Sequence, residues 1–362
     1  MRAAVVNAFG GGFDIEDIDI ADPLGREVLV DVKASGLCHS DLHFAQNDFG
    51  MAPPMVLGHE VSGVVAAIGP DVTEFAVGDH VVGSLVQFCG ACDECLSGRT
   101  VRCLRPEATL RAAGEPPRLS RRGEPVLAAM GTAGFAERAL IHENQLVRID
   151  PAVPFPEASV LGCGTITGAG AAIHAAGVTA GDTVAVIGLG GVGLNVVSGA
   201  RLVGAARIIG IDLNDEKLEL ARAFGATDWV NAGEGDVVAR VRELTGGGVD
   251  HAFEVIGRRQ TVEQAIAMLR VGGTASLIGI HPAGGTFEVD ANTLLREQKK
   301  VNGVYMGSSN IKRDIPFYAS LFLQGRLDLS DLIASEIALD DINSAYAALH
   351  SGKTARTVIT RF

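Results

Sequence analysis

A glycine-rich turn between an apolar strand and a helical segment constrains the fold of this chain more than any other feature. The turn follows the apolar run 183–187, precedes the helical pattern 192–203, and consists of Gly188, Leu189, Gly190, Gly191, Val192 and Gly193. Glycines at this spacing allow a tight turn, close approach of backbone amides to a pyrophosphate, and close packing of the helix on the strand. The helix N-terminus then faces the phosphates. The pattern predicts a dinucleotide site.

An acidic residue supports this interpretation. Asp212 stands nineteen residues after Gly193, at the end of the next apolar run. Its carboxylate can accept hydrogen bonds from the ribose hydroxyls and would repel a 2′-phosphate, which favours NAD over NADP. The alternative is an ordinary strand turn followed by a helix-capping aspartate. The order of strand, turn, helix, strand and acid argues against that alternative.

The apolar runs predict an α/β fold with two domains. Four strand-like runs that alternate with helical stretches lie at 183–187, 207–211, 250–255 and 274–278. This alternation is typical of a doubly wound parallel sheet. From 28 to 146 the runs are short and broken by Gly, Pro and Asp, which indicates a β-rich domain. A chain of 362 residues can form two such cores, and the stretch 111–125, rich in Arg, Pro and Gly, is predicted to be a surface loop.

The charge balance and the apolar runs exclude several kinds of partner. With 30 Lys and Arg against 43 Asp and Glu, the formal net charge is −13, which argues against nucleic acid or an anionic membrane. No run approaches the roughly 20 uninterrupted apolar residues of a membrane helix, and the N-terminal stretch lacks the apolar region of a signal peptide. A cytoplasmic location is therefore expected.

Four of the six cysteines are clustered within fifteen residues. They have the spacing C-x2-C-x2-C-x7-C and are Cys89, Cys92, Cys95 and Cys103. Four thiolates at this spacing match a tetrahedral structural zinc site, whose binding energy would order a lobe too small for its own core. Unligated or disulfide-paired thiols do not suit a chain without an export signal, and an iron–sulfur cluster is the lesser alternative.

The other two cysteines are isolated in the sequence. Cys38 and Cys163 are 125 residues apart, and His59 lies between them. Taken singly, such a Cys is commonly a small buried hydrophobe, and such a His is commonly satisfied by a polar contact. Together the three would form a Cys2His site with a fourth position open, as a catalytic zinc requires. Their spacing alone does not establish that grouping.

Taken in order, these motifs resemble those of the zinc-containing medium-chain alcohol dehydrogenases. The matching stretches are 38–43 (CHSDLH), 58–60 (GHE), the four cysteines, 163–168 (CGTITG), 188–193 (GLGGVG), 253–258 (FEVIGR) and 356–357 (RT). The resemblance implies zinc at two sites per chain, one catalytic and one structural, and NAD. It also implies a GroES-like catalytic domain at 1–164 with a structural-zinc lobe at 86–106, a Rossmann domain at 165–306, and a return to the catalytic domain at 307–362.

The resemblance implies a set of residues at the catalytic zinc, which is Cys38, His59, Cys163 and Glu60. Glu60 would lie behind the metal or bind it transiently, and Asp41 would orient His59 through its free ring nitrogen. Ser40 would hydrogen-bond the oxygen of the alcohol. His43 would pass the alcohol proton outward through the NAD ribose as a general-base relay.

For the cofactor, the resemblance assigns Asp212 and Lys217 to the adenosine ribose, and His39 and Arg356 to the pyrophosphate. The residues assigned to the nicotinamide half are Thr167, Val255, Ile278, Gly279 and Ile280. His39 departs from the arginine of some relatives. Because a neutral histidine attracts phosphate less, NAD would bind more weakly and leave faster. The alternative is that His39 is only an exposed residue at a loop tip.

Alignment to the family pattern places four residues along the alcohol channel, Leu85, Ala129, Met130 and Met306. Relatives that favour ethanol narrow this channel with aromatic rings, and none of the four is aromatic. The resemblance therefore predicts a primary or secondary alcohol that is bulky and apolar, aromatic or medium-chain. A long segment after the fourth clustered cysteine accompanies dimeric members, so a homodimer is expected, with a homotetramer as the alternative.

Three rival functions share parts of this pattern. A thiol-adduct formaldehyde dehydrogenase, of glutathione or mycothiol type, would need cations for its substrate's carboxylates, and the candidates are Arg111, Arg118, Arg121 and Arg122. A solvated basic loop explains these arginines equally well. An acceptor-dependent alcohol dehydrogenase would hold its nicotinamide tightly. A non-catalytic zinc and nucleotide binder is disfavoured, because every predicted zinc ligand is present.

Overall fold

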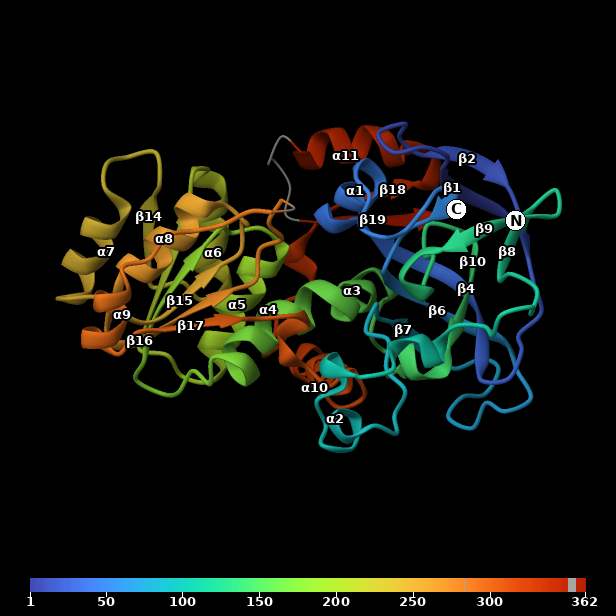
Figure 1. The fold of residues 1–362 in the computed structure, drawn as a ribbon, viewed down its shortest axis with the longest axis horizontal. Coiled ribbons are helices and arrows are strands. Elements are labelled where there is room, and N and C mark those ends of the chain that lie inside the picture. Colours follow the sequence, from blue (N-terminus) through green and yellow to red (C-terminus); the bar gives the residue numbers. More distant parts are fainter. Residues whose placement is uncertain (283, 351–355) are drawn as a thin grey trace. The chain divides into compact units, whose positions relative to one another are not determined.

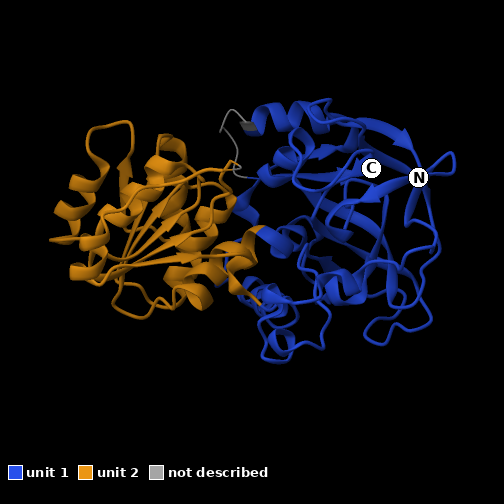
Figure 2. Cartoon of the chain, in the orientation of Figure 1, with its two compact units in different colours: residues 1–163, 310–362 blue, residues 164–309 orange. Residues whose placement is uncertain are grey.

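Two units make up the chain in the computed structural model, which describes residues 1–282, 284–350 and 356–362 (Figure 1). Unit 1 comprises Met1–Cys163 and Asn310–Phe362, and unit 2 comprises Gly164–Ser309 (Figure 2). The C-terminal segment therefore folds with the N-terminal one, as a separate body from the middle of the chain. Among the described residues, no helix is long and apolar enough to span a membrane.

A parallel sheet forms the centre of unit 2. Its strand order is β14-β13-β12-β15-β16-β17, and every pairing is parallel. The strands are β12 (Thr183–Ile187), β13 (Arg207–Asp212), β14 (Asp228–Asn231), β15 (Val249–Glu254), β16 (Leu269–Leu277) and β17 (Lys300–Gly303). The order reverses between β12 and β15, and a doubly wound sheet binds ligands at the carboxyl ends of its strands beside such a reversal. The predicted doubly wound sheet is confirmed.

The connections in unit 2 are helical. They are α4 (Ile166–Gly170), η6 (Ala171–Ala175), α5 (Gly191–Leu202), α6 (Asp215–Phe224), α7 (Val237–Thr245), α8 (Arg259–Ala267), α9 (Ala291–Glu297) and η7 (Met306–Ser308). Helix α6 begins where the Asn214 side chain accepts a hydrogen bond from the amide of Glu216, and it ends at Gly225, which has a positive φ of 116°. The core between helices and sheet consists of small and branched apolar side chains, as a strand buried on both faces requires.

Two sheets form unit 1. One has the order β2-β1-β5-β9-β8-β3, and the other has the order β11-β7-β6-β4-β19-β18 with β10 paired to β4. The strands are β1 (Arg2–Val6), β2 (Asp14–Asp17), β3 (Asp19–Ile20), β4 (Glu27–Gly36), β5 (Met55–Val56), β6 (Glu60–Ile68), β7 (His80–Gly83), β8 (Leu119–Arg121), β9 (Glu124–Ala128), β10 (Arg138–His142), β11 (Leu146–Arg148), β18 (Ile333–Ala338) and β19 (Arg356–Arg361). Most pairings are antiparallel, which agrees with the predicted β-rich architecture.

Unit 1 contains helices of three to 13 residues. They are α1 (His39–Gln46), α2 (Asp93–Leu96), η1 (Thr100–Arg102), η2 (Pro106–Thr109), η3 (Ala129–Gly131), η4 (Glu143–Gln145), α3 (Phe155–Val160), α10 (Ile311–Leu323), η8 (Ser330–Leu332), η9 (Leu339–Asp341) and α11 (Ile342–His350); the π-helical turn η5 (Leu161–Thr165) follows α3. Strand β19 pairs with the end of β4, where Val358 lies opposite Gly36. This pairing brings the C-terminal strand beside Leu37 and the start of α1.

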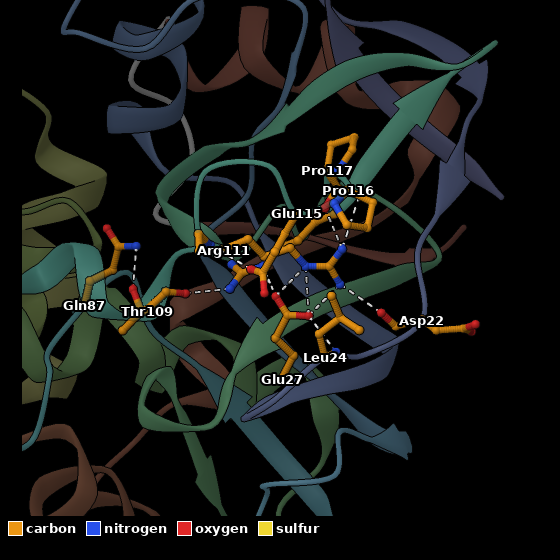
Figure 3. Close-up of polar contacts among 11 residues, drawn as sticks. Asp22, Leu24, Glu27, Gln87, Thr109, Arg111, Glu115, Pro116 and Pro117 are labelled. Atoms are coloured by element: carbon orange, nitrogen blue, oxygen red, sulfur yellow. Dashed lines mark hydrogen bonds and ion pairs between the residues drawn. The ribbon is translucent and has the colours of Figure 1, made fainter.

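The stretch 111–125 agrees in part with the predicted surface loop, because 112–117 and 122–125 are exposed. Its second half forms β8 and the start of β9, and Arg118 is only 8% exposed. The buried carboxylate of Glu27 accepts hydrogen bonds from Arg111 and Arg118 at distances of 2.6 to 3.1 Å (Figure 3). Arg111 also donates to the carbonyl oxygens of Asp22 and Pro116 at 2.8 and 2.7 Å. Composition alone suggested solvation, whereas the distant Glu27 in β4 supplies the partner that buries these cations.

A buried histidine makes the stability of unit 1 depend on pH. The Nδ1 atom of His142 accepts a hydrogen bond from the amide of Asn144, and burial, together with Arg26 and Arg118, lowers the pKa of His142 to about 4. An unfolded histidine binds a proton near pH 6.5, so the unfolded state binds more protons than the folded state between pH 6.5 and 4. The stabilising effect is therefore complete above pH 6.5 and is lost as the pH falls through this window.

Replacing His142 by asparagine is expected to remove this dependence, because asparagine retains an acceptor for the amide of Asn144 but does not titrate. Between pH 7 and pH 4.5 the wild type should lose about 2 kcal/mol more than His142→Asn in its free energy of unfolding, after screening by solvent. Urea unfolding of both proteins at the two pH values measures this difference. Equal losses in the two proteins would contradict the assignment.

Candidate functional site

Four potential metal ligands from distant parts of the sequence meet inside unit 1. The buried cluster, as we call it, consists of Cys38, His59, Glu60 and Cys163, whose donor atoms all lie within 4.8 Å of one another. Cys38 caps the N-terminus of α1, His59 and Glu60 lie at the start of β6, and Cys163 lies in η5. Two thiols, an imidazole and a carboxylate are the donors that zinc prefers, so the residues fit a catalytic zinc.

Polar neighbours orient the ligands of the buried cluster. The Nδ1 atom of His59 lies 2.8 Å from Oδ1 of Asp41, which also accepts a hydrogen bond from the amide of Gly58 at 3.1 Å. With Nδ1 donating to this carboxylate, Nε2 of His59 has its lone pair available for a metal. The Ser40 hydroxyl lies 3.2 Å from that Nε2 atom and 3.1 Å from Sγ of Cys38. A hydrogen bond from Cys163 lowers the pKa of the Cys38 thiol, which favours the thiolate.

Glu60 is a carboxylate that the protein leaves poorly satisfied. It has no exposed surface, and neither of its carboxylate oxygens accepts a hydrogen bond of good geometry. Its Oε1 atom lies 3.0 Å from Nη2 of Arg356, and burial raises the pKa of Glu60 to about 7. The Glu60 side chain packs directly against the backbone of Gly36, because a Cβ added to Gly36 would lie 2.3 Å from Oε2 of Glu60. A buried carboxylate that accepts no hydrogen bond of good geometry, beside two cysteines and a histidine, fits a cation site.

The structure places Arg356 beside Glu60. Arg356 is 3% exposed and donates to the carbonyl oxygen of Leu37 at 3.4 Å. Its assignment to the cofactor pyrophosphate stays a prediction. His39 and His43 are both exposed on α1, which begins directly after Cys38. One short helix therefore carries the predicted proton relay and one of the cysteines.

The other four cysteines also converge. All six cysteines of the chain are free thiols, and the four-cysteine cluster, as we call it, consists of Cys89, Cys92, Cys95 and Cys103. The Sγ atoms of Cys92 and Cys95 are 3.4 Å apart, and Cys92 to Cys103 and Cys89 to Cys95 each measure 4.0 Å. Zinc–sulfur bonds of about 2.3 Å in a tetrahedron require sulfur separations of about 3.8 Å. The amide of Ala91 lowers the pKa of Cys89 to about 6, and the amide of Leu104 lowers that of Cys92, whereas burial raises the pKa of Cys95.

The glycine turn of unit 2 has the geometry that its sequence predicts. Gly188 follows β12 with a φ of 97°, Gly190 caps α5, and helix α5 begins at Gly191. A Cβ added to Gly193 would lie 1.8 Å from the carbonyl oxygen of Gly188, so no other residue fits there. Val192 lies in the first turn of α5, whose N-terminal amides are the groups that a pyrophosphate would contact.

Asp212 ends β13 beside the glycine turn. Its Oδ2 atom accepts a hydrogen bond from the amide of Leu189 at 2.8 Å, and its Oδ1 atom accepts from the amides of Leu213 and Asn214 at 2.8 and 3.1 Å. These bonds hold the carboxylate at the edge of the turn. Lys217 follows in the first part of α6. The arrangement fits a dinucleotide with free ribose hydroxyls, as in NAD.

Four of the five residues predicted for the nicotinamide half gather on two turns, whereas Thr167 lies in α4. Val255 follows β15, and Ile278 to Ile280 follow β16, whose Ile278 and Gly279 amides donate to the carbonyl oxygen of Glu254 at 2.8 and 3.1 Å. The side chain of Glu254, fully buried, accepts hydrogen bonds from the amides of Ile256 and Gly257 at 2.9 and 2.8 Å. Sequence reasoning missed this role of Glu254, which shapes both turns. The only available signal was its place inside the matching stretch 253–258.

The residues predicted to line the alcohol pocket differ in their burial and in the unit to which they belong. In unit 1, Leu85 is half-buried, whereas Ala129 has no exposed surface and belongs to a core cluster. Met130 follows in η3 with a positive φ of 54°. In unit 2, Met306 is buried, and its sulfur lies 3.6 Å from the Thr167 hydroxyl. The lining role of these residues stays a prediction.

Known proteins resemble the whole chain. Residues 25–151 match the model of the alcohol dehydrogenase GroES-like domain, and residues 191–320 match the zinc-binding dehydrogenase model. An S-(hydroxymethyl)glutathione dehydrogenase from Photobacterium damsela subsp. piscicida is 38% identical, with 99% of each chain covered. An NDMA-dependent alcohol dehydrogenase from Amycolatopsis methanolica is 38% identical over 99% of this chain and 98% of its own. The crystal structure of benzyl alcohol dehydrogenase from Acinetobacter calcoaceticus has a TM-score of 0.93 and 36% sequence identity. The match covers 100% of this chain and 99% of that one.

The two metal-ligand clusters, the Rossmann-type sheet and these similarities define a zinc-dependent oxidoreductase that uses NAD. The chain belongs to the zinc-containing medium-chain alcohol dehydrogenase family. The predicted fold class, with a GroES-like and a Rossmann-type part, is confirmed, as are zinc and NAD as cofactors. Family members act on small-molecule alcohols and aldehydes.

Proposed function

We propose that this enzyme oxidises a bulky apolar primary or secondary alcohol, aromatic or medium-chain, to the aldehyde or ketone, with reversible hydride transfer to NAD. The observation that carries the chemistry is the Ser40 hydroxyl, which lies 3.1 to 3.2 Å from two atoms of the buried cluster. The observation that carries the substrate class is the absence of an aromatic side chain at the four predicted pocket positions. The similarity to a benzyl alcohol dehydrogenase supports the same class.

The roles of the residues follow from this proposal. Cys38, His59 and Cys163, with Glu60 close by, would hold the catalytic zinc, which when bound supplies Lewis-acid stabilisation of negative charge on the alcohol oxygen. The Ser40 hydroxyl would relay the alcohol proton by accepting it while donating its own, and exposed His43, on the same helix, would act as the base that releases a proton to solvent. The burial of the cluster excludes water, which strengthens each electrostatic contact.

A screen of alcohols tests the proposal. The zinc-loaded enzyme is expected to oxidise benzyl alcohol with a kcat/KM about tenfold or more above that for ethanol, because a wide apolar pocket gains contacts with the ring. NADH absorbance, followed with NAD and NADP in parallel, measures it. Faster turnover of ethanol than of benzyl alcohol would contradict the substrate class.

A thiol-adduct formaldehyde dehydrogenase is the second candidate, because an S-(hydroxymethyl)glutathione dehydrogenase is among the similar proteins. Three of the four arginines that would bind its carboxylates are engaged in ion pairs: Arg111 and Arg118 with Glu27, and Arg121 with Glu16 at 2.6 Å, whereas Arg122 is exposed. This engagement favours the simple alcohol. Formaldehyde oxidation that requires glutathione or mycothiol would reverse the preference, and nicotinamide that survives dialysis would point to the acceptor-dependent variant.

The cofactor is expected to leave quickly, because His39 replaces an arginine. The side chain is exposed at the start of α1, where a neutral imidazole would attract a pyrophosphate less than a guanidinium. His39→Arg is therefore expected to slow NADH dissociation by about tenfold, which corresponds to one charge-assisted hydrogen bond. Stopped-flow fluorescence of bound NADH measures the rate. An unchanged rate would show that residue 39 does not contact the cofactor.

We further infer a homodimer, with a homotetramer as the alternative. Strand β17 lies at the edge of the parallel sheet of unit 2, and it carries the half-exposed Val301 just before the exposed Tyr305. An unpaired strand edge with apolar side chains suits antiparallel pairing with the same strand of a second copy. The domain limits 1–164, 165–306 and 307–362, and a cytoplasmic location, stay predictions.

A further inference from the structure

Two backbone segments of unit 1 border the buried cluster. Segment 83–87 lies against the turn that carries Cys163. The two backbones approach so closely that a Cβ added to Gly162 would lie 2.1 Å from the carbonyl oxygen of Gly83. Segment 129–135 is bonded to the residue before His59. The carbonyl oxygen of Gly58 accepts hydrogen bonds from the amide of Gly134 at 2.8 Å and from the hydroxyl of Thr132 at 2.9 Å. These segments contain three predicted pocket residues, Leu85, Ala129 and Met130.

One buried side chain joins the two segments. The Nε2 atom of Gln145 donates to the carbonyl oxygens of Ser84 and Met130, each at 3.0 Å. Because a carbonyl oxygen only accepts, the amide nitrogen must face both partners. The backbone oxygen of Gln145 also accepts from the amide of Ser84 at 2.9 Å. Gln145 has no exposed surface, so water cannot replace these bonds.

The segment that Gln145 holds is conformationally strained. Met130 has φ 54° and ψ 14°, and Ala133 has φ 50°. Residues with a Cβ persist in this left-handed region only where their surroundings hold them there. Gly131 lies between them with φ 73°, and a Cβ at this position would lie 2.5 Å from Oε1 of Gln145. The Oε1 atom of Gln145 therefore packs closely against Gly131, while its Nε2 atom donates the two hydrogen bonds.

We propose that Gln145 is a positioning residue that sets the width of the alcohol pocket. By bonding the carbonyl oxygens of Ser84 and Met130, it fixes the distance between the segments that carry Leu85 and Met130. This inference rests on the proposed function for its substrate. Its physical basis lies within unit 1 and involves no atom of the cofactor.

Two variants separate the bonds from the packing. Gln145→Met keeps the volume and removes both donors, whereas Gln145→Glu keeps the shape and sets a carboxylate against two carbonyl oxygens. The matched control is Asn144→Leu. Asn144 is the neighbouring buried carboxamide in η4, and its Nδ2 atom donates to the carbonyl oxygen of Phe88 at 2.7 Å instead.

The selectivity of the zinc-loaded enzyme is the first readout. In Gln145→Met, the ratio of kcat/KM for benzyl alcohol to that for ethanol is expected to fall about tenfold, mainly through KM, with a larger fall in Gln145→Glu. NADH affinity and the zinc content should equal those of the wild type. Asn144→Leu should leave the ratio unchanged. An unchanged ratio in a folded, zinc-loaded Gln145→Met protein would overturn the proposal, as would an equal fall in the control.

Hydrogen exchange provides a readout that does not need turnover. Amides in 83–87 and 129–135 should exchange faster together in Gln145→Met and stay as in the wild type in Asn144→Leu. Unchanged exchange in both segments would overturn the positioning role even if selectivity changed. If the wild type oxidised no alcohol, the proposed function would fail, and the exchange data would still decide whether Gln145 holds the two segments.

Discussion

Replacement of Ser40 by alanine is expected to lower kcat for alcohol oxidation by about 10²- to 10⁴-fold, the range of a lost general acid–base group. The Ser40 hydroxyl is 3.1 Å from the Cys38 sulfur and 3.2 Å from Nε2 of His59, so it is placed to take a proton from an alcohol at the buried cluster. Both kcat and kcat/KM should fall, because the lost contact acts in the transition state. Steady-state NADH formation with benzyl alcohol measures the effect.

The control for this prediction is another buried serine of unit 1. Ser62 donates to the carbonyl oxygen of Phe155 at 2.6 Å, so Ser62→Ala removes a buried hydroxyl that belongs to no ligand cluster. Ser40→Thr should keep most of the activity, because it keeps a hydroxyl. Zinc content and NADH affinity should match the wild type in all three variants. Activity of Ser40→Ala within a factor of about two of wild type would exclude Ser40 from the proton path.

Replacement of Cys92 by alanine is expected to remove one of two zinc ions per chain and to lower the melting temperature by about 10 °C. The lobe around the four-cysteine cluster has a small apolar core, since Val86 and Phe88 are buried but Leu96 and Leu104 are 74% and 69% exposed. It contains only two short helical turns, α2 and η1. Metal ligation therefore supplies most of the stabilisation of the lobe. Metal analysis and calorimetry measure the two effects.

The matched control for Cys92→Ala is Leu96→Ala in the same lobe. Leu96 is 74% exposed, so its truncation should change neither the zinc content nor, beyond about 1 °C, the melting temperature. Cys92→Ala should retain the catalytic metal and some alcohol activity at low temperature, since the buried cluster draws on other residues. Retention of both zinc ions with an unchanged melting temperature would contradict a metal role for the four cysteines.

Features that depend on neighbouring residues were predictable from the sequence. The glycine turn could be identified because each glycine meets a local backbone demand, such as the approach of Gly193 to the carbonyl oxygen of Gly188. The helix predicted at 192–203 is α5, Gly191–Leu202. The four-cysteine cluster could be identified for the same reason, since its ligands lie within one short loop.

Long-range partners were not predictable from local pattern. Arg111 and Arg118 appeared solvated because their partner Glu27 is more than eighty residues away, and burial of these two ion pairs anchors a stretch that is otherwise largely exposed. The roles of Glu254 and Gln145 were not predictable from residue type, because their partners are mainly backbone groups, which leave no trace in it. Family resemblance, rather than spacing, joined Cys38, His59 and Cys163.

The sequence by itself determined the fold class, the dinucleotide turn and the four-cysteine site, because periodicity, glycine geometry and short ligand spacing are local properties of the chain. Only the tertiary structure showed which polar side chains lie together, which form buried ion pairs and which bond backbone groups. It brought Arg356 to Glu60 through the pairing of β19 with β4, and it set Gln145 between Ser84 and Met130. The physical reason is that burial and hydrogen-bond partners arise from contacts between residues far apart in the chain. The pKa and the bonding role of a carboxylate or an amide depend on that burial and on those partners.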